Sequence, residues 1–158
     1  MIAITPATLY DLQSLTELEG QLFSSDRISR RQFRYLLTRA NSIAVKAEAG
    51  GRLLGYLVLL RRKTSRTLRI YSIGVAAYAR NQGVAASLLG YADQVAVQQR
   101  CNRLSLEVCQ HNEAAIKLYK KAGFIEYGQK KNYYGDGCTA LLLQKPLPKT
   151  LPLPECAQ

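Results

Sequence analysis

The sequence predicts a single α/β domain in which helices flank one mixed β-sheet, and three observations lead to this prediction. The chain has 158 residues, of which 47% are hydrophobic, so it is long enough and apolar enough for one domain with its own core. Helix and strand patterns follow one another in the order βααβββαβαββ, without an internal repeat. The end of the chain is proline-spaced and carries neither pattern. We therefore expect one domain over residues 1–145 and a mobile tail over residues 146–158.

The first half of the chain predicts a strand, two helices and three further strands. Residues 2–5 suit a short strand, and after Thr8, a suitable N-cap, leucines recur at helical spacing at positions 9, 12, 15, 18 and 22. A second helix begins at Ser29, which has capping-box spacing to Gln32. Two strands over 42–48 and 53–60 are joined by the glycine turn between them, and a third strand covers 67–75.

The second half predicts a helix, a strand, a helix and two strands. The helix that begins near residue 84 has an inward apolar stripe made of Val84, Leu88, Ala92 and Val95. In the strand over 103–108 the leucines and Val108 share one face, whereas Ser105 and Glu107 share the other. A helix over 112–123 begins at Asn112, a good N-cap. The last strands lie near 124–130 and 138–145.

The charge is strongly positive, because 22 Lys and Arg face 11 Asp and Glu and give a net charge of +11. Such a surface attracts nucleic acid, an acidic protein face or a phosphorylated cofactor, and the charge alone does not choose among them. Two clusters carry much of it, one over residues 61–69 and one at helical spacing in the second helix, made of Arg27, Arg30, Arg31 and Arg34. Each cluster fits a solvated face, and the arginine stripe of the second helix also fits a surface that borders the acceptor groove and guides an acidic or ribosome-bound substrate.

The four cysteines, Cys101, Cys109, Cys138 and Cys156, have neither disulfide-framework nor C-x-x-C spacing, and the chain has one histidine. We expect reduced thiols and no metal site. The first residues lack a targeting pattern, and the longest apolar run, residues 53–60, is too short to span a bilayer. We therefore expect a cytoplasmic protein without a membrane partner.

The segment RNQGVA, residues 80–85, leads from the strand over 67–75 into the next helix and is suited to bind an anion. The start of a helix offers unpaired N–H groups and partial positive charge, Gly83 lets an anion approach the backbone, and Arg80 adds a charge. An ordinary strand-to-helix turn explains the same residues. Context favours the anion site, because residues 75–89 resemble the acetyl-CoA signature of the GNAT superfamily of N-acetyltransferases, with the core pattern Arg80-x-x-Gly83-x-Ala85.

Two further segments are similar to the RimI type of that superfamily, the ribosomal-protein alanine N-acetyltransferases. They are LEVCQHNEAAIKLYKKAGF, residues 106–124, and NYYGDG, residues 132–137. The resemblance extends to about residue 145. It implies a GNAT-like fold, acetyl-CoA as co-substrate without a metal, and a protein or peptide N-terminus as acceptor, with ribosome association as a further expectation.

The resemblance also implies site residues. The backbone of residues 73–75 would meet the pantetheine arm and acetyl group, with a bulge at Gly74, although a packing glycine explains that position too. Asn112 would hydrogen-bond the cofactor in addition to capping its helix. Glu107 would be the base and Tyr119 the acid. The cofactor set is Ile73, Gly74, Val75, Arg80, Asn81, Gln82, Gly83, Val84, Ala85, Ala86, Ser87 and Asn112, and the acceptor set is Arg30, Arg31, Tyr133 and Tyr134.

Without the resemblance, Glu107 fits a surface glutamate equally well and Tyr119 fits a core position. The chain departs from the RimI pattern at Cys109, where arginine is usual, and at Ala77, where proline is common. It has no tryptophan between the first two helices, where residues 23–29 stand instead. The acceptor therefore stays open between a protein N-terminus and a lysine or small amine. A non-catalytic GNAT-like module that binds RNA is a third possibility.

Overall fold

The structure, a computed structural model, describes residues 1–39 and 41–148. This part of the chain contains seven strands and four α-helices. The predicted order is confirmed, with two short 3₁₀ turns added, η1 (Leu9–Asp11) and η2 (Ala77–Ala79). The strands are β1 (Ala3–Pro6), β2 (Ser42–Ala49), β3 (Arg52–Leu60), β4 (Thr67–Val75), β5 (Arg103–Cys109), β6 (Ile125–Lys130) and β7 (Ala140–Pro146). The helices are α1 (Leu12–Leu22), α2 (Arg30–Thr38), α3 (Val84–Gln98) and α4 (Glu113–Lys121).

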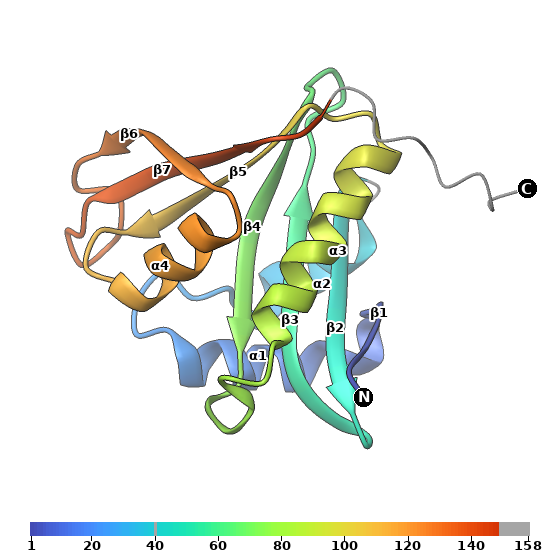
Figure 1. Ribbon diagram of the computed structural model, residues 1–158. Coiled ribbons are helices and arrows are strands. Elements are labelled where there is room, and N and C mark those ends of the chain that lie inside the picture. Colours follow the sequence, from blue (N-terminus) through green and yellow to red (C-terminus); the bar gives the residue numbers. More distant parts are fainter. Residues whose placement is uncertain (40, 149–158) are drawn as a thin grey trace, which may run out of the picture.

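The strands form one sheet in the order β1-β2-β3-β4-β5-β7-β6, and β4 and β5 are its parallel pair. A parallel pair needs a crossover, which α3 provides. The pairing of β4 with β5 covers three residue pairs, from Thr67 opposite Arg103 to Arg69 opposite Ser105. Beyond Arg69 the two strands diverge, and Figure 1 shows the sheet opening between them. The fold therefore has a split in the middle of its sheet.

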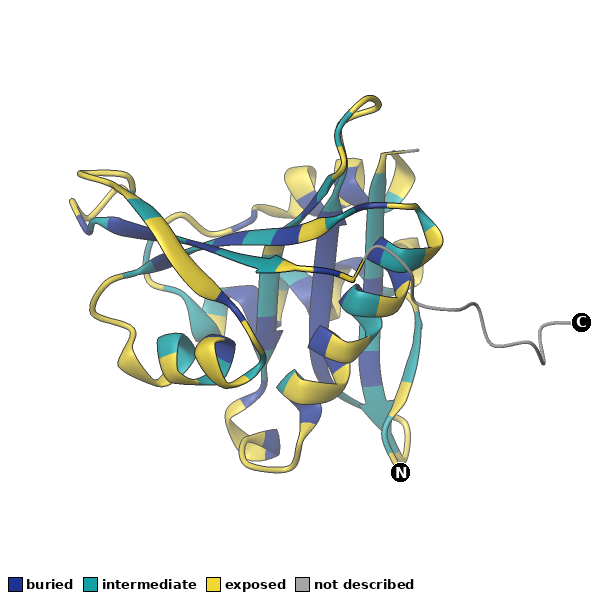
Figure 2. Cartoon of the chain, turned by 45° about the horizontal axis from the view of Figure 1, so that its top comes forward, coloured by how far each residue is buried: buried dark blue, intermediate teal, exposed yellow. Residues whose placement is uncertain are grey.

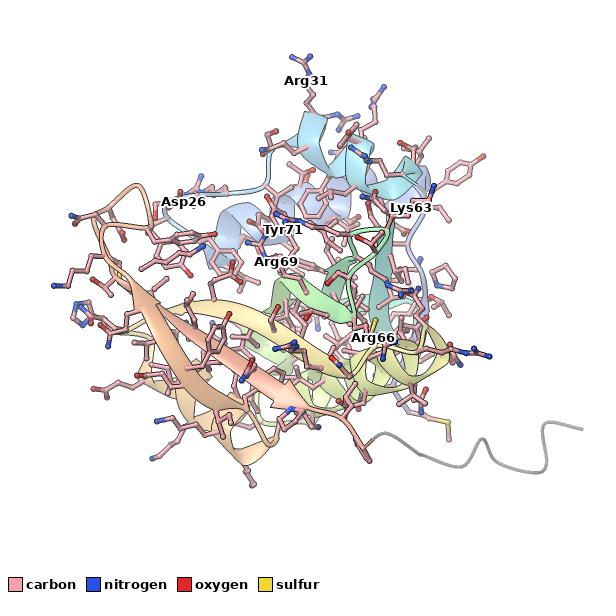
Figure 3. All side chains as sticks on the ribbon, turned by 90° about the horizontal axis from the view of Figure 1, so that it is seen from above. Asp26, Arg31, Lys63, Arg66, Arg69 and Tyr71 are labelled. Atoms are coloured by element: carbon pink, nitrogen blue, oxygen red, sulfur yellow. A yellow bond between two sulfur atoms is a disulfide. The ribbon has the colours of Figure 1, made fainter. Side chains whose placement is uncertain are left out.

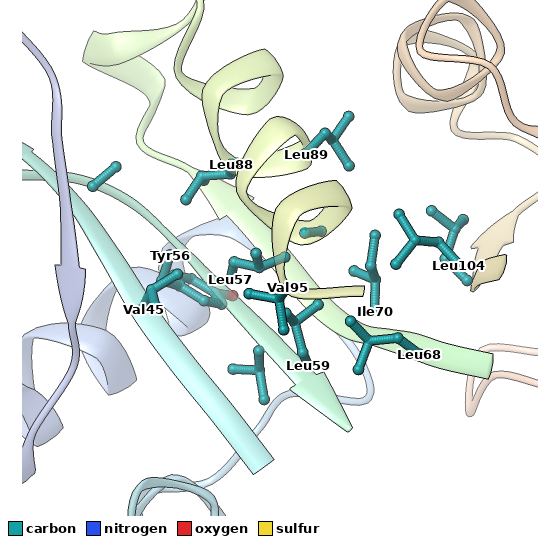
Figure 4. Packing of buried hydrophobic residues seen from close by; sticks show 14 of the residues in the cluster. Val45, Tyr56, Leu57, Leu59, Leu68, Ile70, Leu88, Leu89, Val95 and Leu104 are labelled. Carbon is teal, nitrogen blue, oxygen red and sulfur yellow. The ribbon is translucent and has the colours of Figure 1, made fainter. Parts of the chain in front are cut away.

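Helices cover both faces of the sheet: α1 and α2 lie on one face, and α3 and α4 on the other (Figure 1). The predicted α3 stripe is buried, and Figure 4 shows Leu88 and Val95 packed over the strand residues Leu57 and Ile70. On the opposite face, Phe33 meets the ring of Tyr56 edge to face. In Figure 2 the buried residues concentrate on the central strands and the exposed residues on the outer sides of the helices.

The helix starts follow the sequence signals. Ser29 and Gln32 form the expected capping box at the start of α2, and Thr8 caps η1, which runs directly into α1. Arg27 lies in the loop before α2 rather than on the helix, so the predicted arginine stripe loses its first member. No helix among residues 1–39 and 41–148 is long and apolar enough to cross a membrane.

The bulge in β4 is at Tyr71, not at Gly74 as expected. Ser72 lies opposite Val58 and Ile70 lies opposite Leu59, which leaves Tyr71 as the extra residue. Gly74 pairs regularly with Tyr56, and a Cβ at Gly74 would lie 2.8 Å from the Tyr56 ring and 2.7 Å from Leu22. Gly74 is therefore a packing glycine, which lets the Tyr56 ring lie against β4.

The expectation of reduced thiols is wrong for two of the four cysteines. Cys109 and Cys138 form a disulfide, with their Cα atoms 5.9 Å apart, and Cys101 is free and buried. The pair is 29 residues apart in the chain and meets because β5 and β7 are antiparallel, with Cys109 opposite Ala140. Sheet register, rather than a spacing motif, brings the sulfurs together. Cys156 lies outside the described residues.

The C-terminal boundary extends slightly past the expected one. Pro146 is the last residue of β7, and the next residue, Leu147, is buried and donates its N–H to the carbonyl of Asn102. Residues 149–158 of the predicted tail lie outside the described residues.

Candidate active site

The segment between β4 and α3 is built around Gly83, the N-cap of α3. Gly83 has φ of +79°, a conformation that favours glycine, and no side chain caps the helix. Among the described residues, the first amides of α3 therefore have no intrahelical or side-chain partner, whereas the amide of Ser87 bonds to the Gly83 carbonyl at 3.0 Å. A Cβ on Gly83 would meet no atom within 4 Å, so open space lies beside the backbone here.

Most of this segment faces solvent. Residues 80–83, Ala86 and Ser87 are exposed, Ala85 is half-buried, and Val84 is buried as part of the core stripe. Gln82 donates from Nε2 to the Tyr78 carbonyl at 3.2 Å, which folds the loop back on η2. Residues 49–92 contain no Asp or Glu. The loop therefore offers amides and cations to an anion and no carboxylate to repel it.

Arg52 is a cation near this loop that sequence reasoning missed. Its guanidinium lies 3.6 Å from the centroid of the Tyr78 ring, and the Tyr78 hydroxyl donates to the Leu53 carbonyl. The register of β3 with β4 explains the contact, because Gly55 lies opposite Val75 and so the start of β3 lies beside the end of β4. The register of β3 with β4 places Arg52 near this loop, so a prediction of that register would have identified Arg52.

Residues 73–75 lie on the part of β4 that no longer pairs with β5. On its other edge β4 keeps its antiparallel pairing with β3 through Val75. Within residues 1–39 and 41–148, the edge of β4 that faces the split therefore has no strand neighbour here, and it lies next to the start of α3. Such an edge can pair with an extended ligand in the manner of an added strand.

Glu107 lies on β5 across the split from β4, and its side chain is 15% exposed. Arg69 of β4 holds both carboxylate oxygens, with Nη2 at 2.5 Å from Oε1 and Nε at 3.3 Å from Oε2. The Tyr133 hydroxyl donates to the same Oε1 at 3.3 Å and accepts from Arg69 Nη2 at 3.2 Å. The structure thus brings together Glu107 and Tyr133 and adds Arg69, which sequence reasoning left in a general basic cluster.

The electrostatics of this group follow from its ion pair. Burial lowers the pKa of the Arg69 guanidinium, but its hydrogen bond to Glu107 and the charge of that carboxylate raise the pKa by more. Arg69 is therefore a fixed cation at the point where the split begins. Figure 3 shows Arg69 beside Tyr71, on the side of the sheet where α1 and α2 lie.

Tyr119 projects from α4 into the core, with 8% of its surface exposed. Burial raises the pKa of its hydroxyl to about 12, so it stays protonated at neutral pH. Its ring packs edge to face on Phe124, with centroids 5.9 Å apart. Among the described residues, no hydrogen bond joins the Tyr119 hydroxyl to Glu107 or to any other residue. The two predicted catalytic residues therefore lie on successive elements without a hydrogen bond between them.

Asn112 performs the capping role that the sequence predicts. Its Oδ1 accepts the amide of Ala115 at 3.3 Å at the start of α4, and the residue is exposed. An exposed cap leaves the amide nitrogen of its side chain available to a ligand.

Two loops meet over the split on the side of α1 and α2. The first is the α1–α2 loop, residues 23–29, and the second is the β6–β7 loop, residues 131–139. The amide of Gly135 donates to Asp26 Oδ2 at 2.8 Å, and Figure 3 shows Asp26 beside the β6–β7 loop. Tyr134 packs edge to face on Tyr133 with centroids 5.0 Å apart, and burial followed by the Glu107 charge raises the pKa of Tyr134. The sequence did not indicate Asp26, because its hydrogen-bond partner Gly135 is 109 residues away in the chain.

The other predicted acceptor residues lie elsewhere. Arg30 is the first residue of α2 and is exposed. Arg31 lines a shallow groove on the outer side of α2, and Figure 3 shows it pointing away from Arg69 and Tyr71. The structure therefore does not bring these arginines to Glu107.

Two members of the basic cluster over residues 61–69, Arg61 and Lys63, line a different groove, of about 800 Å³, near the β3–β4 turn. Its rim carries Arg39, Arg61 and Lys63, and its floor is apolar. Within residues 1–39 and 41–148, no three His, Cys, Asp or Glu side chains cluster as metal ligands.

A split parallel pair with an uncapped, glycine-started helix beside it offers an anion site next to a free strand edge, which suits an extended, phosphorylated cofactor. The sequence profile of the acetyltransferase (GNAT) family matches residues 7–124. The chain therefore belongs to the GNAT acetyltransferases, and it is an N-acetyltransferase that uses acetyl-CoA.

Two curated relatives are similar over most of their length. The N-alpha-acetyltransferase RimI of Mycobacterium tuberculosis is 32% identical over 136 residues, which cover 84% of each chain. A putative ribosomal protein bS18-alanine N-acetyltransferase of Bacillus subtilis is 30% identical over 142 residues, 89% of this chain and 93% of that protein. The crystal structure of the Escherichia coli ribosomal-protein-S18-alanine N-acetyltransferase superposes with a TM-score of 0.83 over 97% of this chain and 100% of that chain. At 22% identity, this likeness concerns the fold.

Proposed function

We propose that this acetyltransferase acts on the N-terminal α-amine of a protein, of the ribosomal-protein alanine type, by direct transfer with Glu107 as base and Tyr119 as acid. The names of the two curated relatives support this acceptor class. The observation that carries the proposal is the position of Glu107, which lies across the split from the free edge of β4 and under the two loops that meet at Asp26 and Gly135.

Acetyl-CoA binding is proposed at the free edge of β4 and the start of α3. The uncapped amides, the open space beside Gly83 and the absence of acidic residues over 49–92 fit a pyrophosphate. Residues 80–87 would hold it, and the backbone of residues 73–75 with the Asn112 side chain would bind the pantetheine arm. The co-substrate supplies an acetyl group on a thioester.

Glu107 and Tyr119 suit the two proton transfers of the reaction, removal of the amine proton and protonation of the leaving thiolate. An α-amine with a pKa near 8 costs roughly 1.4 kcal/mol to deprotonate at pH 7, whereas a lysine near 10.4 costs about 4.6 kcal/mol. Each carboxylate oxygen has two lone pairs. Glu107 Oε2 accepts one hydrogen bond from the described part of the chain, from Arg69, so it can also accept from a water that takes the amine proton. The raised pKa of Tyr119 keeps a proton available for the leaving thiolate.

The acceptor would enter between the α1–α2 and β6–β7 loops, where Tyr133 and Tyr134 offer two aromatic rings and a hydroxyl to a peptide. Arg30 and Arg31, on the outer side of α2, suit distal parts of an acidic or ribosome-bound acceptor rather than its amine. A ribosomal protein acceptor would place the enzyme in the cytoplasm.

Mass spectrometry after incubation with acetyl-CoA tests the proposal on three acceptors: a peptide that begins with alanine, the same peptide with a blocked N-terminus and an internal lysine, and a small amine. Acetylation of the first alone supports the proposal. If the blocked peptide or the small amine is acetylated in preference to the peptide that begins with alanine, the proposed acceptor is rejected in favour of lysine or a small amine.

A further inference from the structure

Glu19 of α1 is buried, with 2% of its surface exposed, and it is the one buried charged residue within residues 1–39 and 41–148. A carboxylate in such a place loses its hydration, and well-packed hydrophobic residues often serve stability as well or better. Burial accordingly raises the pKa of Glu19, although its hydrogen bonds oppose the shift. We therefore expect Glu19 to have a role other than general stability, and its contacts define that role.

The Glu19 carboxylate joins three elements. Oε2 accepts the backbone amide of Ile28, in the α1–α2 loop, at 2.8 Å. Oε1 accepts the Tyr56 hydroxyl of β3 and lies 3.5 Å from the Ser72 hydroxyl of β4. The Tyr56 and Ser72 hydroxyls are themselves 3.4 Å apart. Arg27, in the same loop, adds a favourable charge. One buried carboxylate thus fixes a surface loop to β3 and to β4, the strand that lines one side of the split.

The loop that Glu19 fixes is the loop that crosses the split. Ile28 is buried and lies two residues after Asp26, which accepts the amide of Gly135 from the β6–β7 loop. The loop is therefore anchored from inside at Ile28 and from across the split at Asp26. Ser72 follows the Tyr71 bulge and precedes residues 73–75, so the same carboxylate also contacts β4 where its edge becomes free.

We infer that Glu19 is a positioning residue for the acceptor: its carboxylate sets the α1–α2 loop against β3 and β4, and thereby sets the width of the entrance that Asp26 and Gly135 close. The inference rests on the proposed function in one respect, that the acceptor enters between these two loops. Acetyl-CoA lies on the other side of the sheet in this arrangement, next to α3. Loss of Glu19 should therefore affect acceptor use and leave cofactor use unchanged.

Steady-state kinetics on Glu19→Leu test this separation. A misplaced entrance loop is expected to raise the acceptor KM about tenfold or more, while the acetyl-CoA KM stays within about twofold of the parent value. Glu19→Gln should recover much of the loss, because its carbonyl oxygen can accept the Ile28 amide while its NH₂ donates to the Tyr56 hydroxyl. Glu17→Gln, on the exposed side of the same helix, is the matched control and should behave as the parent.

Hydrogen exchange at the Ile28 amide gives a readout that does not depend on turnover. In the parent protein this amide should be protected, and in Glu19→Leu its protection should fall while amides of the central strands keep theirs. Tyr56→Phe removes one donor and leaves the Ile28 contact, so it is a second variant that should exchange at Ile28 nearly as the parent does.

Two results would overturn the inference: an acceptor KM for Glu19→Leu within twofold of the parent, or an equal rise in both KM values. Unchanged protection at Ile28 in Glu19→Leu would overturn it as well. A parent enzyme that acetylates none of the peptides contradicts the proposed function instead. An active parent whose Glu19 variants match it in acceptor KM contradicts the positioning role alone.

Discussion

Glu107 is held from two sides, by the Arg69 guanidinium and by the Tyr133 hydroxyl, so its carboxylate faces the split in a fixed orientation. The ion pair is partly exposed, with the Arg69 side chain 39% accessible, and so it adds little to stability. Its effect is geometric: a bidentate contact removes the rotational freedom of the carboxylate. A base that acts through a water depends on such fixed geometry.

Glu107→Gln should slow acetylation of a peptide α-amine, and the defect should shrink as pH rises. As the proposed base, Glu107 would remove a proton that, above the amine pKa of about 8, is already absent from most of the substrate. The measurement is the ratio of parent to variant kcat/KM between roughly pH 6.5 and 9.5, which spans that amine pKa. A ratio that does not change with pH would reject Glu107 as the base, and a ratio that falls only above about pH 10 would indicate a lysine acceptor.

Tyr119→Phe should lower the rate of the chemical step by about a hundredfold or more, a typical effect of a lost general acid, and should largely spare acetyl-CoA binding. The ring remains to pack on Phe124, so the core is preserved. Single-turnover rates and acetyl-CoA affinity, measured side by side, separate the two effects. An unchanged single-turnover rate would remove Tyr119 from the mechanism.

The uncapped start of α3 is the proposed binding site for the pyrophosphate of acetyl-CoA. Gly83→Glu should abolish the thermal stabilisation by acetyl-CoA, because it forces a side chain onto a backbone with φ of +79° and places negative charge in front of the free amides. For the parent, cofactor at a hundred times its Kd should stabilise by about 2.7 kcal/mol. Gly90→Glu is the matched control, since Gly90 is exposed on the same helix and far from its start. Equal thermal shifts in both variants would reject the loop assignment.

The disulfide joins β5 to the β6–β7 loop just beyond Glu107. Cys109→Ser should lower the free energy of unfolding by about 3 kcal/mol, because the cross-link closes a chain of 29 residues in the unfolded state. Denaturant unfolding of the parent with and without reductant measures the same quantity, and the variant should show no further loss in reductant. If reductant leaves the parent's unfolding curve unchanged, the disulfide does not form in solution.

Local patterns predicted the elements well, because alternation and helical spacing are properties of adjacent residues. The β5 alternation placed Leu104 and Leu106 in the core, and the Ser29 capping box fixed the start of α2. The contacts that sequence reasoning missed join residues far apart in the chain. Arg69 meets Glu107, Asp26 meets Gly135 and Cys109 meets Cys138 through strand register and loop approach, which no short spacing encodes. The Gly74 bulge was misplaced because a packing glycine and a bulge glycine look alike in sequence.

Over the whole molecule, the positive charge is not evenly spread. The stretch from residue 49 to 92 has no acidic side chain, and it forms both the loop before α3 and the basic rim near the β3–β4 turn, at opposite ends of β3 and β4. A highly charged cofactor approaches such a surface faster at low salt. Glu107 lies on β5, outside that stretch, and brings a carboxylate to the split, whereas Glu19 of α1, also outside it, is buried.

Glu19 should also leave a signature in the pH dependence of global stability. Its pKa in the folded protein is raised above the ordinary value of 4.5, chiefly by burial, so between these two values the folded state binds more protons than the unfolded state. Stability from this group is therefore fully present below about pH 4.5 and is lost as pH rises through the folded pKa. In Glu19→Gln, which does not titrate at this position, that loss should be absent. The measurement is the free energy of unfolding by denaturant for parent and variant at several pH values from 4 to 8, with Glu17→Gln as the exposed control on α1. A parent advantage over Glu19→Gln that grows with rising pH would mean that the folded protein favours the carboxylate form, and that the hydrogen bonds from Ile28 and Tyr56 outweigh the cost of burial.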